Sequence, residues 1–320
     1  IVWYQTLVED TFPTLDNTRK QIYVIGNIKC DGTFLSGEVS YTNDKEAASS
    51  IPPHNYIEGV CTECGNSDPG YAQLVDGWYE VSNPEQLLYI SALVNSGKFD
   101  IKVRLTADID LSGISYFPPI GKQYYPQGPA LSFNGVFDGQ GHIIYNLNID
   151  KDDPGAETGL FGRIENATVK NLGIVNATFK NPSALRAGVL GGSSINSNVI
   201  NCFTTGEINM GDCICSYDSR NGDGLFGLVF TGSILTNCYT TYGTLGNDYA
   251  PDIKFENCYW GENVTKMVRT GELCYKLNNS SFINPNWYQT IGEDEFPVLD
   301  STHGIVYVTG DSSYASFPTD

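Results

Sequence analysis

Gly159-Leu160-Phe161-Gly162 is the first of three short turns that share one pattern, an apolar pair between two glycines. Gly188-Val189-Leu190-Gly191 and Gly224-Leu225-Phe226-Gly227 repeat it. About ten residues after each turn comes an apolar residue, a spacer and an asparagine: Val169-Lys170-Asn171, Val199-Ile200-Asn201 and Leu235-Thr236-Asn237. The pattern predicts an internal repeat, and a repeat constrains the fold more than any other sequence feature.

A repeat of roughly 20 to 35 residues with short β-branched runs cannot bury its own apolar face, so its copies must stack on one another. Alternation of residue types within the runs indicates strands rather than helices. We therefore expect a β-solenoid with the Leu and Phe residues pointing inward. Asparagine side chains should hydrogen-bond along the stack. The asparagines expected in this column are Asn146, Asn171, Asn201, Asn237 and Asn257.

The string Phe133-Asn134-Gly135-Val136-Phe137-Asp138-Gly139-Gln140-Gly141-His142, followed by Asn146-Leu147, resembles the GLUG-type repeat of large bacterial surface proteins. Leu105-Thr106-Ala107-Asp108-Ile109-Asp110-Leu111, with Pro119-Ile120-Gly121 after it, is similar to the opening signature of that family. The resemblance covers roughly residues 78–310. It implies an all-β fold, a right-handed parallel β-helix, in an extracellular repeat module. It implies no chemistry, because fold does not fix function.

Composition narrows the classes of partner. The chain has 320 residues and a formal net charge of −19, with 18 basic against 37 acidic side chains. This balance argues against a nucleic-acid partner. The sequence has no apolar run long enough to insert in a membrane. Because it begins at Ile1 without a signal peptide, we expect a processed or excised piece.

A second repetition links the two ends of the chain. Residues 3–18, beginning Trp3-Tyr4-Gln5-Thr6, reappear in closely similar form at residues 287–302, beginning Trp287-Tyr288-Gln289-Thr290, and the match continues to Val24 and Val308. We interpret both copies as the closing segment of a module, the first belonging to or mimicking the end of a preceding module. The partners would then be neighbouring modules of a tandem array. A single module clasped by two related termini is the alternative.

Residues 27–76 differ from the rest because the repeat is absent and Cys and His cluster. Cys61-Thr62-Glu63-Cys64-Gly65 has the form of a metal knuckle, in which two thiolates reach one ion and the glycine relieves the tight turn. Cys30 and His54 would complete a tetrahedral set of four ligands. We expect a structural zinc ion at Cys30, His54, Cys61 and Cys64. Such a closed site stabilises a small domain and does not catalyse.

Two alternatives to the metal remain open from the residues alone. Two of the cysteines could form a disulfide in an oxidising compartment, or the thiols could be free with His54 on the surface. Residues 54–65 resemble small Cys/His segments between the repeats of gut-type bacterial surface proteins, which favours the metal.

Helix signals flank the repeats. Ser82-Asn83-Pro84-Glu85 predicts a short capping helix that ends at Asn95-Ser96-Gly97 and covers the open edge of the first strands. A shorter helix is expected over residues 270–277. The predicted organisation is a closing-type segment (residues 1–26), a small zinc-ribbon-like Cys/His segment (27–76), a GLUG-type β-helix (77–265), and a C-terminal helix with a closing segment (266–320).

The remaining cysteines have different predicted roles. Cys202, Cys238 and Cys258 each follow a column asparagine, so they should be free thiols that stack as small apolar groups. Cys274 should be buried on the short helix. Cys213 and Cys215 lie in a long excursion and could form a loop disulfide.

Three carboxylates, Asp108, Asp110 and Asp138, are candidates for catalysis, because right-handed β-helices include polysaccharide lyases and hydrolases. Glycoside hydrolysis needs two carboxylates at a controlled separation. Turn formation is the competing role of these acids. His142 could serve as an acid or base, but capping of a turn is favoured. His303 has no acidic partner that the sequence identifies.

These observations predict a non-enzymatic extracellular module of a large bacterial surface protein, serving as an adhesin or stalk scaffold at the cell surface. The alternatives are a carbohydrate-binding module and a polysaccharide-degrading β-helix enzyme, a lyase or glycosidase. Carbohydrate binding is considered because planar rings pack on sugars; the rings could equally seal loops. Host or dietary glycans or surface proteins are the possible ligands. The residues considered for glycan contact are Trp78, Tyr124, Tyr125 and Trp260.

Overall fold

The computed structural model describes residues 3–30, 32–33, 39–57, 59–66, 68–122, 130–149, 156–179, 184–209, 224–248, 252–279 and 286–309. The chain divides into two compact units, Ile1–Tyr71 and Ala72–Asp320, here called unit 1 and unit 2. Tyr124, Tyr125, Cys213 and Cys215, for which roles were predicted, lie outside the described residues.

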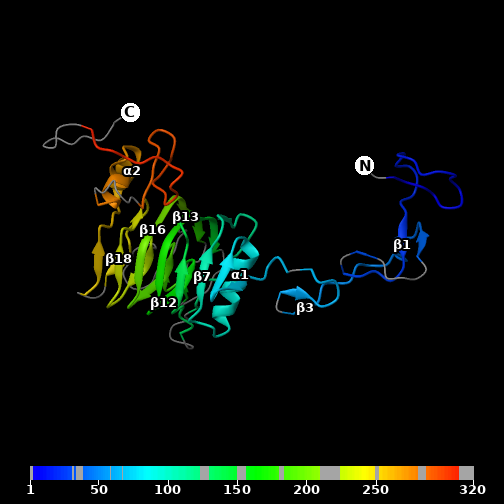
Figure 1. Cartoon of the computed structure of the whole chain (residues 1–320), viewed down its shortest axis with the longest axis horizontal. Helices are drawn as coiled ribbons and strands as arrows, with labels where there is room; N and C mark the ends of the chain where they lie inside the picture. The colour runs from blue at the N-terminus through cyan, green and yellow to red at the C-terminus, as the bar shows by residue number, and fades with distance from the viewer. Residues whose placement is uncertain are drawn as a thin grey trace. The chain divides into compact units, whose positions relative to one another are not determined.

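Unit 2 is built on stacked strands, drawn from cyan to yellow in Figure 1. The main sheet follows the order β21-β18-β16-β13-β9-β7-β6-β5, with β8, β10 and β19 paired off this path. Its strands are β5 (Gln73–Val75), β6 (Trp78–Val81), β7 (Lys102–Leu105), β8 (Ile109–Asp110), β9 (Val136–Asp138), β10 (Ile143–Ile149), β13 (Thr168–Phe179), β16 (Asn198–Asn209), β18 (Ile234–Thr236), β19 (Tyr239–Thr240) and β21 (Lys254–Glu256).

A second sheet has the order β12-β15-β17-β20 and is parallel throughout. Its strands are β12 (Phe161–Glu165), β15 (Gly191–Ile195), β17 (Phe226–Val229) and β20 (Asn247–Asp248). A short parallel pair, β11 (Glu157–Thr158) and β14 (Arg186–Ala187), lies just before β12 and β15 in the chain.

The core follows from the register of these strands. Phe161 pairs with Gly191, and Gly191 pairs with Phe226, so the leucines that precede them occupy equivalent places. Leu160, Leu190 and Leu225 are all buried in one apolar cluster. Side chains from the main sheet, including Val169, join the same cluster. Apolar burial is therefore shared between successive repeats, as stacking requires.

Asparagines make the bends between strands. Asn171, Asn201, Asn237 and Asn257 all have φ between 52° and 54°. This left-handed region is costly for most L-residues, whereas asparagine tolerates it. The same residue that turns the chain therefore places an amide at each rung.

The amides form columns along the stack. Asn201 donates to Asn171 at 3.0 Å, Asn237 donates to Asn201 at 3.2 Å, and Asn257 donates to Asn237 at 2.8 Å. The prediction that these asparagines bond to one another is confirmed for these four residues. Asn146 was wrongly placed in this column.

Asn146 belongs to a parallel column. It donates to Asp110 at 2.8 Å and accepts from Asn176 at 3.3 Å. The reason is register: β10 pairs with the second half of β13, while β9 pairs with its first half. The position next to Asn171 at the start of its column is therefore occupied by Asp138, whose carboxylate accepts from the Asn171 side-chain amide at 3.0 Å.

The prediction of an all-β, right-handed parallel β-helix is wrong. The largest sheet is mixed, because β5 pairs with β6 in antiparallel fashion. Asp76 and Gly77 join these strands with φ of 50° and 80°. A two-residue Asp-Gly loop is the strongest short-range signal for an antiparallel hairpin, and it lies outside the repeat on which the prediction rested.

Antiparallel pairing recurs in unit 1, and helices are present as well as strands. β1 (Tyr23–Ile25) pairs with β2 (Ser40–Thr42), and β3 (Tyr56–Ile57) pairs with β4 (Val60–Cys61), both antiparallel. The described residues also form three α-helices, α1 (Pro84–Asn95), α2 (Glu262–Arg269) and α3 (Glu272–Leu277).

The capping helix is confirmed as α1. The Asn83 side chain accepts a hydrogen bond from the Gln86 N–H, and Pro84 occupies the first turn. Leu87, Ile90 and Val94 are buried in the core of unit 2. Figure 1 shows α1 beside the β7 end of the stacked strands.

The C-terminal helices differ from the prediction. The expected helix appears as α3, but α2 was missed, because its N-cap is Gly261 without a side-chain hydrogen bond and it is rich in β-branched residues. Tertiary packing stabilises α2: Val264 and Val268 are buried in a second apolar cluster with Phe203 and Tyr239. The carbonyls of the last α3 residues, Lys276 and Leu277, accept the amide of Asn257 and so end the asparagine column.

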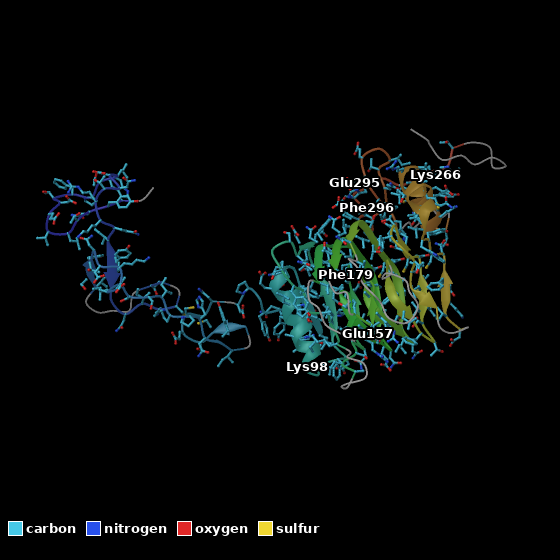
Figure 2. All side chains as sticks on the ribbon, turned by 180° about the vertical axis from the view of Figure 1, so that it is seen from behind. Lys98, Glu157, Phe179, Lys266, Glu295 and Phe296 are labelled. Atoms are coloured by element: carbon cyan, nitrogen blue, oxygen red, sulfur yellow. The ribbon has the colours of Figure 1, made fainter. Side chains whose placement is uncertain are left out.

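The second copy of the repeated end sequence, residues 287–308, packs on this cluster. Trp287 is fully buried, with its ring 5.7 Å from Phe203 and 5.6 Å from Tyr239. Phe296 lies 5.7 Å from Phe203. Figure 2 shows Glu295 and Phe296 beside Lys266 of α2.

The predicted column of thiols is confirmed. Cys202 and Cys238 are fully buried, and the Cys238 N–H donates to the Cys258 sulfur at 3.4 Å. These three and Cys274 are free. Burial raises the pKa of the Cys238 thiol well above its ordinary value, so it behaves as a small apolar group.

Candidate functional site

The four predicted ligands in unit 1 lie together. The ligand atoms of Cys30, His54, Cys61 and Cys64 are all within 4.8 Å of one another, close enough to hold a metal ion. Cys30 Sγ is 3.4 Å from Cys61 Sγ, and Cys64 Sγ is 3.3 Å from His54 Nδ1. A disulfide would need about 2.05 Å between sulfurs, and all three cysteines are free.

Two tight turns present the thiols. Cys30 lies in a turn closed by Lys29 N–H donating to Thr33 O at 2.7 Å. Cys61 ends β4, and the Gly65 N–H donates back to Cys61 O at 2.9 Å. Gly65 has φ of +76°, which is why a glycine follows the CxxC pair.

The electrostatics of the cluster favour an anionic sulfur at Cys61. Burial acts to raise the pKa of Cys61, but hydrogen bonds from the backbone N–H groups of Cys64 and Glu63 lower it to about 5. Burial, with the neighbouring thiols of Cys64 and Cys61, raises the pKa of Cys30 to about 12. One ligand is therefore a thiolate at neutral pH, while another would give up its proton to a metal.

The carboxylates considered for catalysis all have structural partners. Asp138 is 3% exposed and accepts from the Gln140 N–H and the Asn171 amide, while Lys170 Nζ lies 3.0 Å away. Burial alone would raise its pKa, but these contacts lower it below the ordinary value. Asp110 accepts from Asn146 and from the Ser112 N–H, and these bonds lower its pKa.

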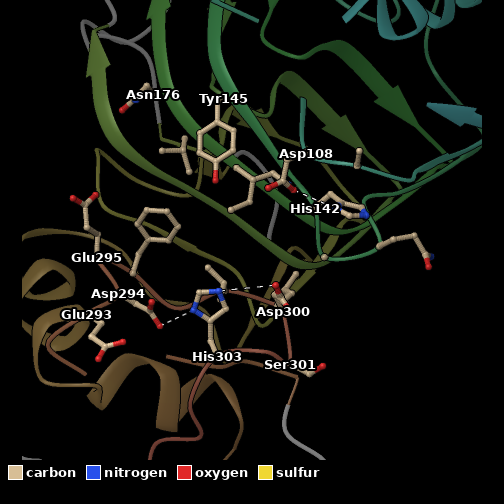
Figure 3. A pocket seen from close by; sticks show the side chains of 18 of the residues that line it. Asp108, His142, Tyr145, Asn176, Glu293, Asp294, Glu295, Asp300, Ser301 and His303 are labelled. Atoms are coloured by element: carbon tan, nitrogen blue, oxygen red, sulfur yellow. Dashed lines mark hydrogen bonds and ion pairs between the residues drawn. The ribbon is translucent and has the colours of Figure 1, made fainter. Parts of the chain in front are cut away.

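A groove of about 990 Å³ lies between the turns of the main sheet and residues 293–303 (Figure 3). The strand side contributes Asp108, His142 and Tyr145; the other side contributes Glu293, Asp294, Glu295, Asp300 and His303. Asp138 does not line this groove. Five carboxylates named here line the groove, so whether it can catalyse depends on what those carboxylates contact.

The first histidine of the groove ties two turns together. His142 Nδ1 is 3.1 Å from Asp108 Oδ1, and the same oxygen accepts the Ile143 N–H at 2.9 Å. The predicted preference for a turn role over acid–base chemistry fits these contacts.

His303 has the acidic partners that the sequence did not identify. Its Nδ1 is 2.9 Å from Asp294 Oδ2, and its Nε2 is 4.0 Å from Asp300 Oδ2. The first copy of the segment has the same arrangement, with Arg19 Nη1 3.0 Å from Asp10 Oδ1. Comparison of the two copies could have identified this pairing, because each has a basic side chain, Arg19 or His303, nine positions after the aspartate.

The described aromatic candidates do not form one sugar platform. Trp78 lies in β6, with Lys102 Nζ 5.8 Å from its ring centroid. Trp260 follows β21 and packs 5.8 Å from Phe255. Five strands separate β6 from β21 in the main sheet, which places the rings far beyond the span of one sugar residue.

Comparisons with known proteins give two similarities. Over 150 residues, 44% of this chain, the sequence is 35% identical to Halomucin of Haloquadratum walsbyi, and this chain spans 2% of the length of that protein. A candidate immunoglobulin A1 protease from Bacteroides ovatus is similar in structure, with a TM-score of 0.42 and 18% identity over 69% of this chain and 91% of that chain. At this TM-score the likeness carries no conclusion on fold or activity. No protein-family model matches the sequence. None of the helices in the described part of the chain is long and apolar enough to cross a membrane.

Proposed function

We propose that this chain is a non-enzymatic scaffold module of a large extracellular surface protein, acting as part of an adhesin or stalk. The observation that carries the proposal is the use of polar side chains inside unit 2. Asp138, which could have been catalytic, is buried and starts a column of four asparagine amides. Polar groups bonded in this way stiffen a stack of repeats.

The groove between the turns and residues 293–303 supports the same function. Asp108 accepts a backbone N–H, Asp294 accepts the Thr290 N–H, and Asp300 accepts the Thr302 N–H. Asp294 and Asp300 therefore close turns, and Asp108 ties two segments of the chain together. A glycosidase would instead direct two carboxylates at one scissile bond.

The place of the module in a larger protein is supported by the Halomucin match. The 150 matched residues make up 2% of Halomucin, so that relative is several thousand residues long and consists mostly of other segments. The surface location is supported by the same match and by the resemblance of residues 133–147 to repeats of bacterial surface proteins.

Zinc is the metal that fits the four ligands of unit 1. Three sulfurs and one imidazole nitrogen match the closed tetrahedral set that structural zinc prefers, and softer sulfur ligands disfavour magnesium and calcium. The metal would hold the turns of Cys30 and Cys61 together. Among the described residues of unit 1, Cys30 and Cys61 are the only buried apolar side chains, so the unit needs such a crosslink.

The scaffold role is tested by incubating the full chain with acidic and neutral polysaccharides and measuring reducing ends and unsaturated products. We expect no cleavage, and no titratable binding on a glycan array. Cleavage that is lost in Asp138→Asn, with the circular dichroism unchanged, would overturn the proposal in favour of an enzyme. Glycan binding lost in Tyr125→Ala would overturn it in favour of a binding module.

The zinc assignment has its own test, elemental analysis of the purified full chain with counting of accessible thiols. We expect one zinc per chain, lost in Cys61→Ser and kept in Cys274→Ser. A wild-type chain free of metal after purification and zinc addition would refute the assignment.

A further inference from the structure

The two copies of the repeated end sequence fold in the same way. In the N-terminal copy (residues 3–24), Tyr4 and Thr14 exchange two backbone hydrogen bonds, each of 2.8 Å. In the C-terminal copy (residues 287–308), Tyr288 and Val298 do the same at 2.8 and 2.9 Å. The copies are therefore repeated units of structure as well as of sequence.

Their internal ties also correspond. Asp10 accepts the Thr6 N–H and pairs with Arg19, as Asp294 accepts the Thr290 N–H and pairs with His303. Further along, Asp16 accepts the Thr18 N–H and Asp300 accepts the Thr302 N–H, both at 2.9 Å. Each copy is thus a small self-closed loop that presents the same apolar side chains.

The copies differ in what covers those side chains. In the N-terminal copy, Trp3 is 59% exposed, Phe12 is 76% exposed and Leu15 is 58% exposed. Trp287 is 0% exposed, and Phe296 and Leu299 are partly buried against the same cluster. An exposed tryptophan, phenylalanine and leucine on one small loop indicate an interaction surface.

The C-terminal copy identifies what fits this surface. Trp287 contacts the stacked rings of Phe203 and Tyr239, which lie 5.1 Å apart with an angle of 7° between their planes. The Tyr239 hydroxyl donates to Pro297 O at 2.9 Å, and Gln289 Nε2 donates to Val268 O of α2 at 2.8 Å. The receiving surface is therefore an aromatic pair on the sheet flanked by α2 and α3.

We infer that the N-terminal copy docks on a preceding module, through Trp3, Phe12 and Leu15, against an aromatic pair and helix pair like those of Phe203, Tyr239, α2 and α3. Within this chain the surface formed by Phe203, Tyr239, α2 and α3 is already covered by Trp287, so the partner of the N-terminal copy is the same surface on another module. The inference rests on the proposed function in that the partner is a neighbouring module of one parent chain. The N-terminal copy then completes the module that precedes this one.

The inference is tested by a graft in the full chain, with residues 3–20 replacing residues 287–304. We expect the thermal unfolding midpoint of unit 2 to fall by less than about 4 °C. The comparison variant is Trp287→Ala, which should lower it by about 6–20 °C, because it empties a fully buried ring site. The same graft carrying Trp3→Ala should lower the unfolding midpoint of unit 2 as much as Trp287→Ala does. A second graft with Val8→Gly removes the strain of a valine at positive φ, since the matching residue is Gly292 with φ of 86°.

Two results would overturn the inference. One is a loss of stability in both grafts as large as in Trp287→Ala, which would mean that the N-terminal copy does not fit the surface. The other concerns the unmodified chain, where Trp3→Ala with Phe12→Ala should leave the unfolding of unit 2 unchanged. A large loss there would mean that the face is already covered within the chain. Neither result bears on polysaccharide cleavage, so failure of the docking and failure of the scaffold role are separable.

Discussion

The side-chain amide of Asn171 donates to Asp138 Oδ1 at 3.0 Å, and this bond starts the column that continues through Asn201 and Asn237 to Asn257. Each amide in the column both accepts and donates, so neighbouring bonds polarise one another. A buried carboxylate at one end and helix carbonyls of α3 at the other satisfy the two ends of the column.

The first prediction concerns acid stability. The pKa of Asp138 is lowered on folding, so its contribution to the free energy of unfolding is present above the unfolded pKa of about 4. It is lost as the pH falls through the lower folded pKa. Asp138→Ala should reduce the free energy of unfolding at pH 7 by about 1–3 kcal/mol, measured by urea titration of unit 2.

Asp138→Asn is the matched control for charge. It keeps an oxygen that can accept from Asn171 but has no titration between pH 2 and 5, so the acid limb of the stability curve should flatten. An acid limb as steep as that of the wild type would show that other carboxylates set the acid sensitivity.

The second prediction separates the two roles of Asn201, which bends the chain with φ of 52° and bonds to Asn171 and Asn237. Asn201→Gly keeps the bend and removes the amide, at a cost of about 1–3 kcal/mol in the free energy of unfolding. Asn201→Ala should cost about 1–2 kcal/mol more, because alanine resists positive φ. Equal losses in the two variants would mean that the bend is not under strain.

How far the sequence predicts the fold can be judged from these same residues. Spacing was enough to identify Asn171, Asn201, Asn237 and Asn257 as stacked, because a repeat imposes equivalent places on equivalent letters. Asn146 was misplaced because one long strand, β13, pairs with β9 and β10 in turn, and local pattern does not reveal which half pairs with which. The mixed sheet followed from Asp76 and Gly77, a local signal outside the repeat.

The third prediction concerns Gly173, which lies beside Phe203 in the paired strands β13 and β16. A Cβ at Gly173 would lie 2.3 Å from the Phe203 ring. Gly173→Ala should therefore lower the free energy of unfolding of unit 2 by about 1–3 kcal/mol through overpacking. With Phe203→Leu in addition, the alanine should cost less than it does alone, giving a measurable coupling in a double-mutant cycle. Strict additivity of the two losses would contradict the overlap.

The metal cluster was predictable for a different reason. The CxxCG knuckle at Cys61 is local, so its form is visible in the sequence. Cys30 and His54 are distant in the chain, and only the chemistry of a complete tetrahedral set linked them to it. Nothing comparable indicated α2, whose helical state depends on the burial of Val264 and Val268 beside Tyr239.

The fourth prediction follows from the protonation of the cluster. Because the pKa of Cys30 is raised to about 12, its proton must leave when a metal binds at pH 7. Titration calorimetry with zinc in buffers of different ionisation enthalpy should report release of at least one proton, and zinc affinity should fall as the pH falls. A chelator should abolish the unfolding transition of unit 1 and leave that of unit 2 in place. Zinc binding without proton release would contradict the assignment of Cys30 as a ligand.

The fifth prediction compares Val8 with its counterpart Gly292, which have φ of 74° and 86°. A β-branched residue at positive φ is strained by about 1–2 kcal/mol, whereas glycine there costs about 0.5–1 kcal/mol in the entropy of the unfolded chain. Strain exceeds entropy, so Val8→Gly should stabilise unit 1 and Gly292→Val should destabilise unit 2, each by up to about 1.5 kcal/mol. Amide hydrogen exchange of the full chain resolves the two units separately. Loss of protection in Val8→Gly would mean that the N-terminal copy tolerates the strained valine because contacts of its side chain compensate. Val8 is fully exposed, which argues against such contacts within this chain and makes the sign of the effect a direct measure of backbone strain.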